Sequence, residues 1–370
     1  MAQTLTRTPS RTRTKVQIVD GDIHNAVASD KALYPYLPQR WRQYHAQFGM
    51  RTYTGATYPR MSPNAARTDA WPTSGLPPGA DLSFLQAQLL DAWNIEYGVC
   101  NPLVGIQGPY VEYTAALAQA VNEWQVAEWL EPEPRLKGSI VIPYEDGDLA
   151  AAEIDRAARD PRFVQVLMLI RSTEPLGKRR FWKIYEAAER NGLPVGIHFG
   201  GAGGNPFTGA GWPSFYLEDH GGTSQVFQAQ IASFVCEGVF ERFPGLNIVL
   251  IEGGFAWLAP LMWRLDTAWK RLKDEVPYLR RAPSEQIRQQ VWLTTQPMEE
   301  PEKPEHFVQL LDHLGMADHL MFATDYPHWD FDAPDQAIPA RLAPDVETGI
   351  MAGNAKRLYR FGESVVGSRQ

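Results

Sequence analysis

Four apolar segments of the sequence end in side chains that can bind a metal ion or transfer a proton. They end at Asp22 and His24, at His198, at Glu252 and at Asp325. Each segment is an apolar run, and three of them are rich in Val, Ile and Leu, which is typical of strands buried inside a protein. A single ending of this kind carries little information. Four of them, separated by helical patterns, predict side chains gathered at one mouth of a parallel barrel, where such enzymes keep their active sites.

The residue types at these endings suit a catalytic metal. Asp22 and His24 are two residues apart on a strand, so their side chains point to the same face. His198 adds a second imidazole and Asp325 a second carboxylate, giving two nitrogen and two oxygen ligands with room for water or substrate. Taken singly, each residue is more commonly a turn, cap or hydrogen-bonded pocket residue. Jointly they predict one divalent ion, Zn or Mn, with Fe also compatible.

The elements that must position these residues can be read from the periodicity. Helix-period segments lie between most of the strand-like segments, and this alternation predicts a parallel α/β sheet. The helical segments include 81–97, 112–130, 148–158, 179–191, 225–243 and 305–314. The strand-like segments are 16–22, 97–103, 137–142, 163–170, 194–198, 247–252, 291–295 and 320–325. Eight units within one composition regime predict a single (β/α)₈ TIM barrel over residues 16–362.

Two long insertions interrupt this pattern. Residues 27–80 are rich in Pro, Tyr, Arg and Trp, and residues 200–222 are rich in glycine. Both follow a ligand-bearing strand, so we expect both to lie over the C-terminal mouth of the barrel. The glycine-rich segment lacks the Gly-Lys-Ser/Thr of a phosphate loop and is interpreted as a lid. Residues 1–15 are expected to be a disordered N-terminal tail, and residues 363–370 a C-terminal tail.

The composition excludes several function classes. The chain has 370 residues, is 44% hydrophobic and carries a net charge of −8 without a basic stripe, so we expect no nucleic-acid partner. No apolar run has transmembrane length and the N-terminus is not a secretory signal, so a cytoplasmic protein without membrane contact is expected. Cys100 and Cys236 are interpreted as buried, reduced thiols. The 12 Trp and 29 Pro suggest aromatic-rich loops over a small-molecule pocket or a homodimer interface.

Two longer motifs carry a family resemblance. One is Asp325-Tyr-Pro-His-Trp-Asp330, and the other runs from Ile251-Glu-Gly-Gly to Trp263-Arg-Leu-Asp266. With the acid-x-His and Gly-Ile-His endings, the chain resembles the amidohydrolase-related branch of the amidohydrolase superfamily over residues 16–360. That branch contains aminocarboxymuconate-semialdehyde decarboxylase and the resorcylate-type decarboxylases. The resemblance implies one divalent metal ion and a strand-eight Asp that doubles as a proton carrier. The implied ligands are Asp22, His24, His198 and Asp325.

The chain departs from this branch at two positions. Many relatives carry His-x-His or Glu-x-His on the first strand, where this chain has Asp22-Ile-His24. The decarboxylases carry a His that takes part in the reaction at the end of strand six, where this chain has Glu252. Glu252 could instead act as a general base on water, or be a structural partner of Arg264 or of loop amides. Binuclear members use a Lys on strand four, which 163–170 lacks, so one metal is expected.

Further candidates lie near the expected mouth. His220 is a candidate acid or base, with a helix cap or surface position as the alternative. Arg171 follows strand four and suits a substrate carboxylate, although a surface salt bridge explains it equally well. His328 could orient Asp325 or bind substrate. Three aromatic residues could line the pocket, although loop packing also explains them: Phe199, Trp212 and Trp329.

These observations lead to one main hypothesis and three alternatives. The main hypothesis is a mononuclear metal-dependent hydrolase that attacks a C–N or C–O bond of a small aromatic or cyclic acid through an activated water. Glu252 or Asp325 would accept the proton. The first alternative is a metal-dependent, non-oxidative decarboxylase of an aromatic or muconate-like acid. A hydratase would need similar groups. A barrel that serves only as a scaffold is disfavoured because all four ligand types are retained.

Overall fold

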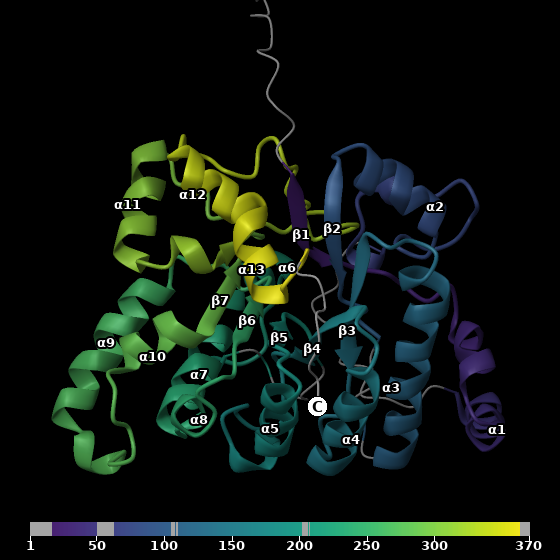
Figure 1. The fold of residues 1–370 in the computed structure, drawn as a ribbon, viewed down its shortest axis with the longest axis horizontal. Coiled ribbons are helices and arrows are strands. Elements are labelled where there is room, and N and C mark those ends of the chain that lie inside the picture. Colours follow the sequence, from purple (N-terminus) through teal and green to yellow (C-terminus); the bar gives the residue numbers. More distant parts are fainter. Residues whose placement is uncertain are drawn as a thin grey trace, which may run out of the picture.

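The computed structural model describes residues 17–49, 63–104, 108, 110–201, 206 and 208–362. Within them, eight parallel strands pair in sequence order to form a nearly closed barrel surrounded by helices (Figure 1). The predicted (β/α)₈ barrel is therefore confirmed. The strands are β1 (Ile18–Ile23), β2 (Ile95–Cys100), β3 (Leu136–Val141), β4 (Phe163–Leu169), β5 (Val195–His198), β6 (Ile248–Ile251), β7 (Val291–Thr294) and β8 (Leu320–Met321).

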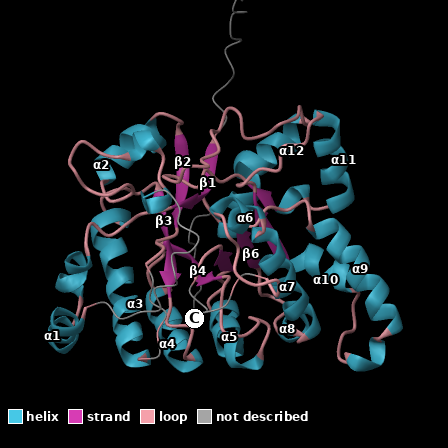
Figure 2. Cartoon of the chain, turned by 180° about the vertical axis from the view of Figure 1, so that it is seen from behind, coloured by secondary structure: helices cyan, strands magenta, loops and turns pink. Residues whose placement is uncertain are grey.

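The helices lie outside the strands, as Figure 2 shows from behind. Several have clear start and stop signals: the Asp146 side chain accepts hydrogen bonds from the first turn of α4, and Gly315 ends α11 in the left-handed region. The helices are α1 (Gln39–Phe48), α2 (Leu82–Leu85), α3 (Val111–Gln125), α4 (Gly147–Ala157), α5 (Trp182–Arg190), α6 (Tyr216–Gly221), α7 (Thr223–Cys236), α8 (Val239–Arg242), α9 (Leu258–Arg271), α10 (Pro283–Gln290), α11 (Pro304–Leu314), α12 (Pro344–Thr348) and α13 (Asn354–Tyr359).

Some predicted boundaries differ from the structure for local reasons. The helical run expected over 81–97 ends earlier because Asn94 adopts a left-handed φ of 56°, and β2 begins at the next residue. Gly238, with φ of 77°, divides the segment 225–243 into α7 and α8. Cys100 is buried as expected, but Cys236 is exposed because it is the last residue of α7.

The barrel is closed by the segment that follows β8 rather than by β8 itself. The Gly21 amide donates to the Phe322 carbonyl at 2.9 Å, and the His24 amide donates to the Tyr326 carbonyl at 2.8 Å. Strand β8 is only two residues long, so the predicted strand over 320–325 is mostly irregular backbone. This backbone brings Asp325 beside β1, since its amide donates to the Asp22 carbonyl at 3.2 Å.

The first insertion divides into two parts with different positions. Helix α1 packs against the flank of α3, where the Trp41 and Tyr113 rings lie 5.5 Å apart, so the expectation that the whole insertion covers the mouth is wrong (Figure 1). Residues 63–70 do reach the segment after β8: Ala66 bridges His328, and the Trp329 amide donates to the Ala65 carbonyl at 2.7 Å. Residues 50–62 and both expected tails, 1–15 and 363–370, lie outside the described residues.

The core under the mouth contains a polar network as well as aliphatic side chains. Asn101 accepts hydrogen bonds from Ser139 Oγ at 2.6 Å and Gln165 Nε2 at 2.9 Å, and Tyr359 donates to Gln165 at 2.9 Å. All of these polar side chains except Tyr359 are fully buried. The network therefore fixes the side chains directly beneath the strand ends. In the described part of the chain, none of the helices is both long enough and apolar enough to cross a membrane.

Candidate metal centre

The four predicted ligands converge at the C-terminal end of the barrel. Asp22 and His24 come from the end of β1, His198 ends β5, and Asp325 follows β8. One ligand atom from each lies within 4.8 Å of the others, and all four residues are buried. His24 Nε2 is 2.7 Å from Asp325 Oδ1, and His198 Nε2 is 3.1 Å from Asp22 Oδ2.

Both imidazoles are oriented from behind. His24 Nδ1 donates to the backbone carbonyl of Asn101 at 2.8 Å, and His198 Nδ1 donates to the backbone carbonyl of Phe199. These bonds leave both Nε2 atoms pointing at the carboxylates, and such backing is usual for metal-bound histidines. Asn101 also donates from Nδ2 to Asp22 Oδ1 at 2.8 Å. The donor set, its burial and its backing fit one divalent cation.

The charges of the ligands depend strongly on one another. Burial alone would lower the pKa of His24, but the Asp22 and Asp325 carboxylates raise it to about 9. Burial alone would raise the pKa of Asp22, but His24 and His198 hold it below its ordinary value. Asp325 is likewise held ionised, by His328 and His24, against the effect of its burial on its pKa. Two ionised carboxylates facing two imidazoles suit a cation in the space between them.

Two of the carboxylate residues have an unusual backbone. Glu252 and Asp325, which follow β6 and β8, both have φ of 60°. This left-handed conformation is disfavoured for residues with a Cβ and recurs at functional sites, where the surrounding structure maintains it. At both positions it ends an extended run and places the side chain at the mouth.

A second group of side chains lies next to the ligands. His220 from α6, Glu252 and Asp330 bring one ligand-type atom each within 4.8 Å of one another. His220 Nε2 is 3.0 Å from Asp330 Oδ2, and Glu252 Oε2 is 3.4 Å from His198 Nε2. Gln296 Nε2 links the two groups, since it donates to Asp325 Oδ2 at 3.2 Å and to Asp330 Oδ2 at 2.9 Å.

Two side chains of this second group, His220 and Glu252, have raised pKa values and so keep their protons to higher pH. The hydrogen bond to Asp330 raises the pKa of His220 despite its partial burial. Burial, together with the negative charges of Asp325, Asp330 and Asp22, raises the pKa of Glu252 well above its usual range. Arg264, considered from the sequence as a partner of Glu252, is instead exposed on α9.

The structure also places the remaining candidates. Arg171 forms an ion pair with Asp219 of α6 at 2.9 Å and lies 5.0 Å from the Phe199 ring, so it holds α6 against the end of β4. His328 Nδ1 is 2.7 Å from Asp325 Oδ1, and its ring stacks on His24 at 4.3 Å. Trp329 lies 5.2 Å from the His220 ring. Trp212 is 50% exposed, at the surface of its loop.

Sequence reasoning missed three residues of this site. Asn101 and Gln296 carry no charge, and their roles depend on contacts between elements far apart in the chain. Asp330 appeared only as the last residue of a motif. The signal that could have found Asn101 and Gln296 is their position, because each closely follows the end of a strand, as the ligands do.

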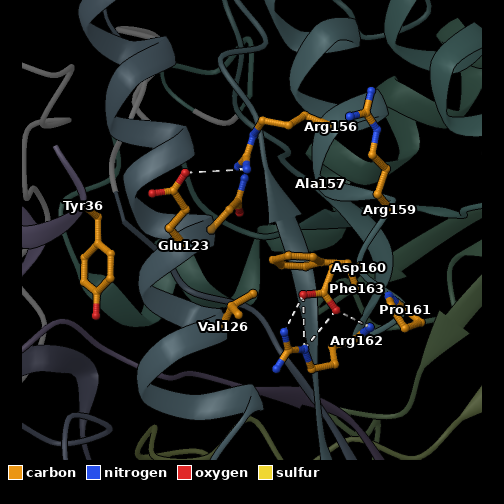
Figure 3. Close-up of a pocket in the computed structure, with 11 residues that line it drawn as sticks. Tyr36, Glu123, Val126, Arg156, Ala157, Arg159, Asp160, Pro161, Arg162 and Phe163 are labelled. Carbon is orange, nitrogen blue, oxygen red and sulfur yellow. Dashed lines mark hydrogen bonds and ion pairs between the residues drawn. The ribbon is translucent and has the colours of Figure 1, made fainter. Parts of the chain in front are cut away.

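A pocket of about 840 Å³ lies near the N-terminal end of β4, away from the mouth that holds the metal ligands. It is lined partly by the loop before β4 and by Phe163, the first residue of that strand (Figure 3). Two of its three arginines are held in ion pairs, Arg156 with Glu153 and Arg162 with Asp160, both at 2.7 Å. This pocket is therefore separate from the candidate metal centre.

Comparison with known proteins decides the family. A family model described as amidohydrolase matches residues 19–361. This chain belongs to that amidohydrolase family. Among curated proteins, this family member is 23% identical over 318 residues to the gamma-resorcylate decarboxylase of Polaromonas sp., covering 78% of this chain and 94% of the relative. It is 24% identical over 321 residues to the decarboxylase of the same name from Rhizobium sp., covering 78% and 93%.

Solved structures support the fold of this amidohydrolase. The dihydroxybenzoic acid decarboxylase of Polaromonas sp., solved with manganese and 2-nitroresorcinol, superposes with a TM-score of 0.65 at 18% identity, covering 94% of this chain and 98% of that one. The 5-carboxyvanillate decarboxylase of Novosphingobium aromaticivorans, also solved with manganese, gives a TM-score of 0.69 at 18% identity, covering 93% and 97%. Both neighbours were solved with manganese. In this chain, the buried cluster of two His and two Asp fits one divalent cation.

Proposed function

We propose that this amidohydrolase-family protein is a metal-dependent, non-oxidative carboxy-lyase that acts on a hydroxyl-substituted aromatic acid. The main support is the combination of a buried site of two His and two Asp with curated relatives that are named as gamma-resorcylate decarboxylases. The comparisons thus favour the decarboxylase alternative left open by the sequence over the main hypothesis of hydrolysis.

The reaction needs one bond broken and one formed. The bond between the ring carbon and the carboxylate carbon breaks, CO₂ leaves, and the electron pair stays on the ring carbon, which takes up a proton. A divalent ion held by Asp22, His24, His198 and Asp325, of which Mn and Zn are the candidates, would supply a Lewis acid for the substrate carboxylate and a neighbouring oxygen.

The side chains of the second group are placed to supply the proton. Glu252 and His220 lie beside the ligands and face each other within 4.8 Å. Asp325, which is held ionised, is a candidate relay for a proton rather than its source, because His24 and His328 both contact its Oδ1 at 2.7 Å. Trp329 and His328 would contact the substrate ring, and Arg171 would act on the substrate only indirectly, by holding α6.

The test is release of CO₂ from a small hydroxybenzoate. The full chain, loaded with Mn²⁺ or Zn²⁺, is incubated with 2,6-dihydroxybenzoate or 5-carboxyvanillate in D₂O, and CO₂ and ring deuteration are measured. We expect both, and we expect Asp325→Asn to abolish them. Asp318→Asn is the matched control, because Asp318 is largely exposed and lies before β8.

One observation favours hydrolysis as a second candidate function. Glu252 Oε2 lies 3.4 Å from His198 Nε2, where an ionised carboxylate could accept a proton from water. The same metal-loaded preparation is therefore assayed with aryl amides and lactones. Hydrolysis of one of these without CO₂ release from any aromatic acid would replace the proposed function with this second one.

A further inference from the structure

A pocket of about 660 Å³ opens beside the second group of side chains. Its lining comes from the first insertion, from α6 and from the segment after β8. The lining residues are Ala66, Arg67, Thr68, Asp69, Tyr216, Leu217, His220 and Trp329. His220 belongs both to this lining and to the group beside the metal ligands. The pocket and the group beside the candidate metal centre therefore share His220.

The exposed fraction of the residues rises from the metal ligands through His220 to Trp329. The side chains of His198 and Asp325 have no exposed surface, that of His220 is 18% exposed, and Trp329 is 47% exposed. Because the Trp329 ring lies 5.2 Å from the His220 ring, a ligand that approached the metal ligands past His220 would pass close to Trp329. The outer end of such a ligand occupies the pocket.

One wall of the pocket is aromatic. The Trp329 ring lies 5.2 Å from the His220 ring and 6.2 Å from the Tyr216 ring, and its Nε1 donates to Tyr216 Oη at 3.2 Å. These bonds hold the Trp ring in place, so it offers a fixed apolar face. Flat apolar groups pack well on such a face.

The charged groups in the pocket lining are already neutralised. Arg67 makes two hydrogen bonds with Asp69, at 2.8 and 2.7 Å, and its guanidinium lies 4.2 Å from the Phe331 ring. His220 is paired with Asp330 in the same way. A second anionic group on the ligand would find each cation of the lining already paired, so an uncharged group fits better.

We infer that this pocket is the distal part of the substrate site, and that the substrate is an aromatic acid whose reacting ring carries a second, uncharged aromatic ring or a substituent of similar size. The inference rests on the proposed function, because the metal ligands must hold the reacting carboxylate. Pockets of this size usually hold ligands larger than one substituted benzene ring. The second ring would pack on Trp329 between α6 and the Arg67–Asp69 pair.

The experiment compares a short and an extended substrate on the Mn²⁺-loaded full chain. The probes are 2,6-dihydroxybenzoate and 2-hydroxy-4-phenylbenzoate, whose phenyl group lies para to the carboxylate. We expect kcat/KM of the wild type to be about tenfold higher for the phenyl compound, as is usual when an apolar group fills a pocket. A preference for the short acid would overturn the inference while leaving the proposed function intact.

Two variants test the pocket itself. Leu217→Trp narrows it at a residue that is 83% exposed, so folding should be unaffected, and Trp329→Ala removes the aromatic wall. Leu217→Trp should lower kcat/KM for the phenyl compound by about tenfold and change it for the short acid by less than about twofold. Trp329→Ala should lower kcat/KM for both acids, because Trp329 also contacts the reacting ring, but should lower it more for the phenyl compound. Leu272→Trp, at an exposed Leu after α9, is the matched control and should change neither. Equal effects on both acids would overturn the inference.

Two further measurements separate the remaining outcomes. If neither acid releases CO₂, the proposed function is rejected, and titration calorimetry then gives the dissociation constants of the two acids. Tighter binding of the phenyl compound that is lost in Leu217→Trp would support the pocket. Equal binding of the two acids would reject it. The alternative occupant of this pocket is a second copy of the chain, and analytical sedimentation detects it as a dimer. A wild-type dimer that becomes a monomer in Leu217→Trp would make the pocket a subunit interface and overturn the inference.

Discussion

Asn101 supports the metal ligands without carrying charge or binding metal. Its side chain is fully buried directly after β2. Nδ2 donates to Asp22 Oδ1 at 2.8 Å, and Oδ1 accepts from Ser139 at 2.6 Å and Gln165 at 2.9 Å. Replacing Asn101 with Ala removes these three bonds but keeps the backbone carbonyl that orients His24.

The expected magnitude follows from these three bonds. Losing a partner that orients a ligand typically weakens metal binding by about 10- to 100-fold, which is about 1.4–2.7 kcal/mol. The Ser139 and Gln165 donors lose a buried acceptor, and each costs about 1–3 kcal/mol if it finds no other partner. We therefore expect Asn101→Ala to bind Mn²⁺ at least about tenfold more weakly and to lose about 2–4 kcal/mol of unfolding free energy.

The assay is competition with a chelator of known affinity, followed by denaturant unfolding of the metal-free protein. Asn122→Ala is the matched control: Asn122 is also buried, donates to Val141 and Glu153 at 2.9 and 2.6 Å, and belongs to α3, away from the ligands. It should lose similar stability but keep wild-type metal affinity. If Asn101→Ala also keeps wild-type metal affinity, its side chain does not orient Asp22 in the way described.

Three further predictions concern charge and metal. Asp330→Asn should lower the pKa of His220, so that any step needing protonated His220 fails at lower pH than in the wild type, which pH profiles of kcat would show; an unchanged profile would contradict this role. Burial raises the pKa of Asp332 to about 7, so native protein binds more protons than unfolded protein between pH 4 and 7, and stability falls as pH rises through that window. Asp332→Asn should remove that loss, gaining about 1–2 kcal/mol at pH 8 after allowance for partial exposure, and a variant no more stable than wild type would count against it. Removing the metal with a chelator should cost about 2.7 kcal/mol relative to protein at metal concentrations 100-fold above Kd, seen as a lower Tm; an unchanged Tm would mean that no ion binds the native state.

Much of the fold could be predicted from the sequence because its strands are buried on both faces. Val, Ile and Leu runs such as 247–252 mark each strand without any tertiary information, and helical periodicity marks the intervening segments. The end of the barrel was less predictable. Residues 322–326 have the composition of a strand but hydrogen-bond to β1 in irregular conformations, and sequence patterns do not encode that pairing. The position of α1 on the flank of α3 likewise depends on contacts between side chains such as Trp41 and Tyr113.

The ligands of the candidate site were predictable for the same reason as the strands. A charged or imidazole side chain that ends an apolar run must lie at the mouth of the barrel. Asp330 follows no strand, and its importance comes from its contact with His220 on another element. Gln296 does follow β7, but it is uncharged, and its importance comes from its contact with Asp325. The role of Arg171 also could not be predicted, because its partner Asp219 lies 48 positions further along the chain, on α6.

The closure of the barrel has a consequence for when the newly made chain can bind its metal ion. Strand β1 meets the segment after β8 through backbone hydrogen bonds at Gly21, Asp22 and His24, and metal ligands lie on both sides of this junction. His24 and Asp325 are 301 positions apart in sequence, so an ion held between them closes a very long loop, whose entropy cost grows only with the logarithm of its length. The ion would therefore connect β1 to the segment after β8 and stabilise the closed barrel. A chain still emerging from the ribosome cannot hold it with this ligand set until its last strand has been made.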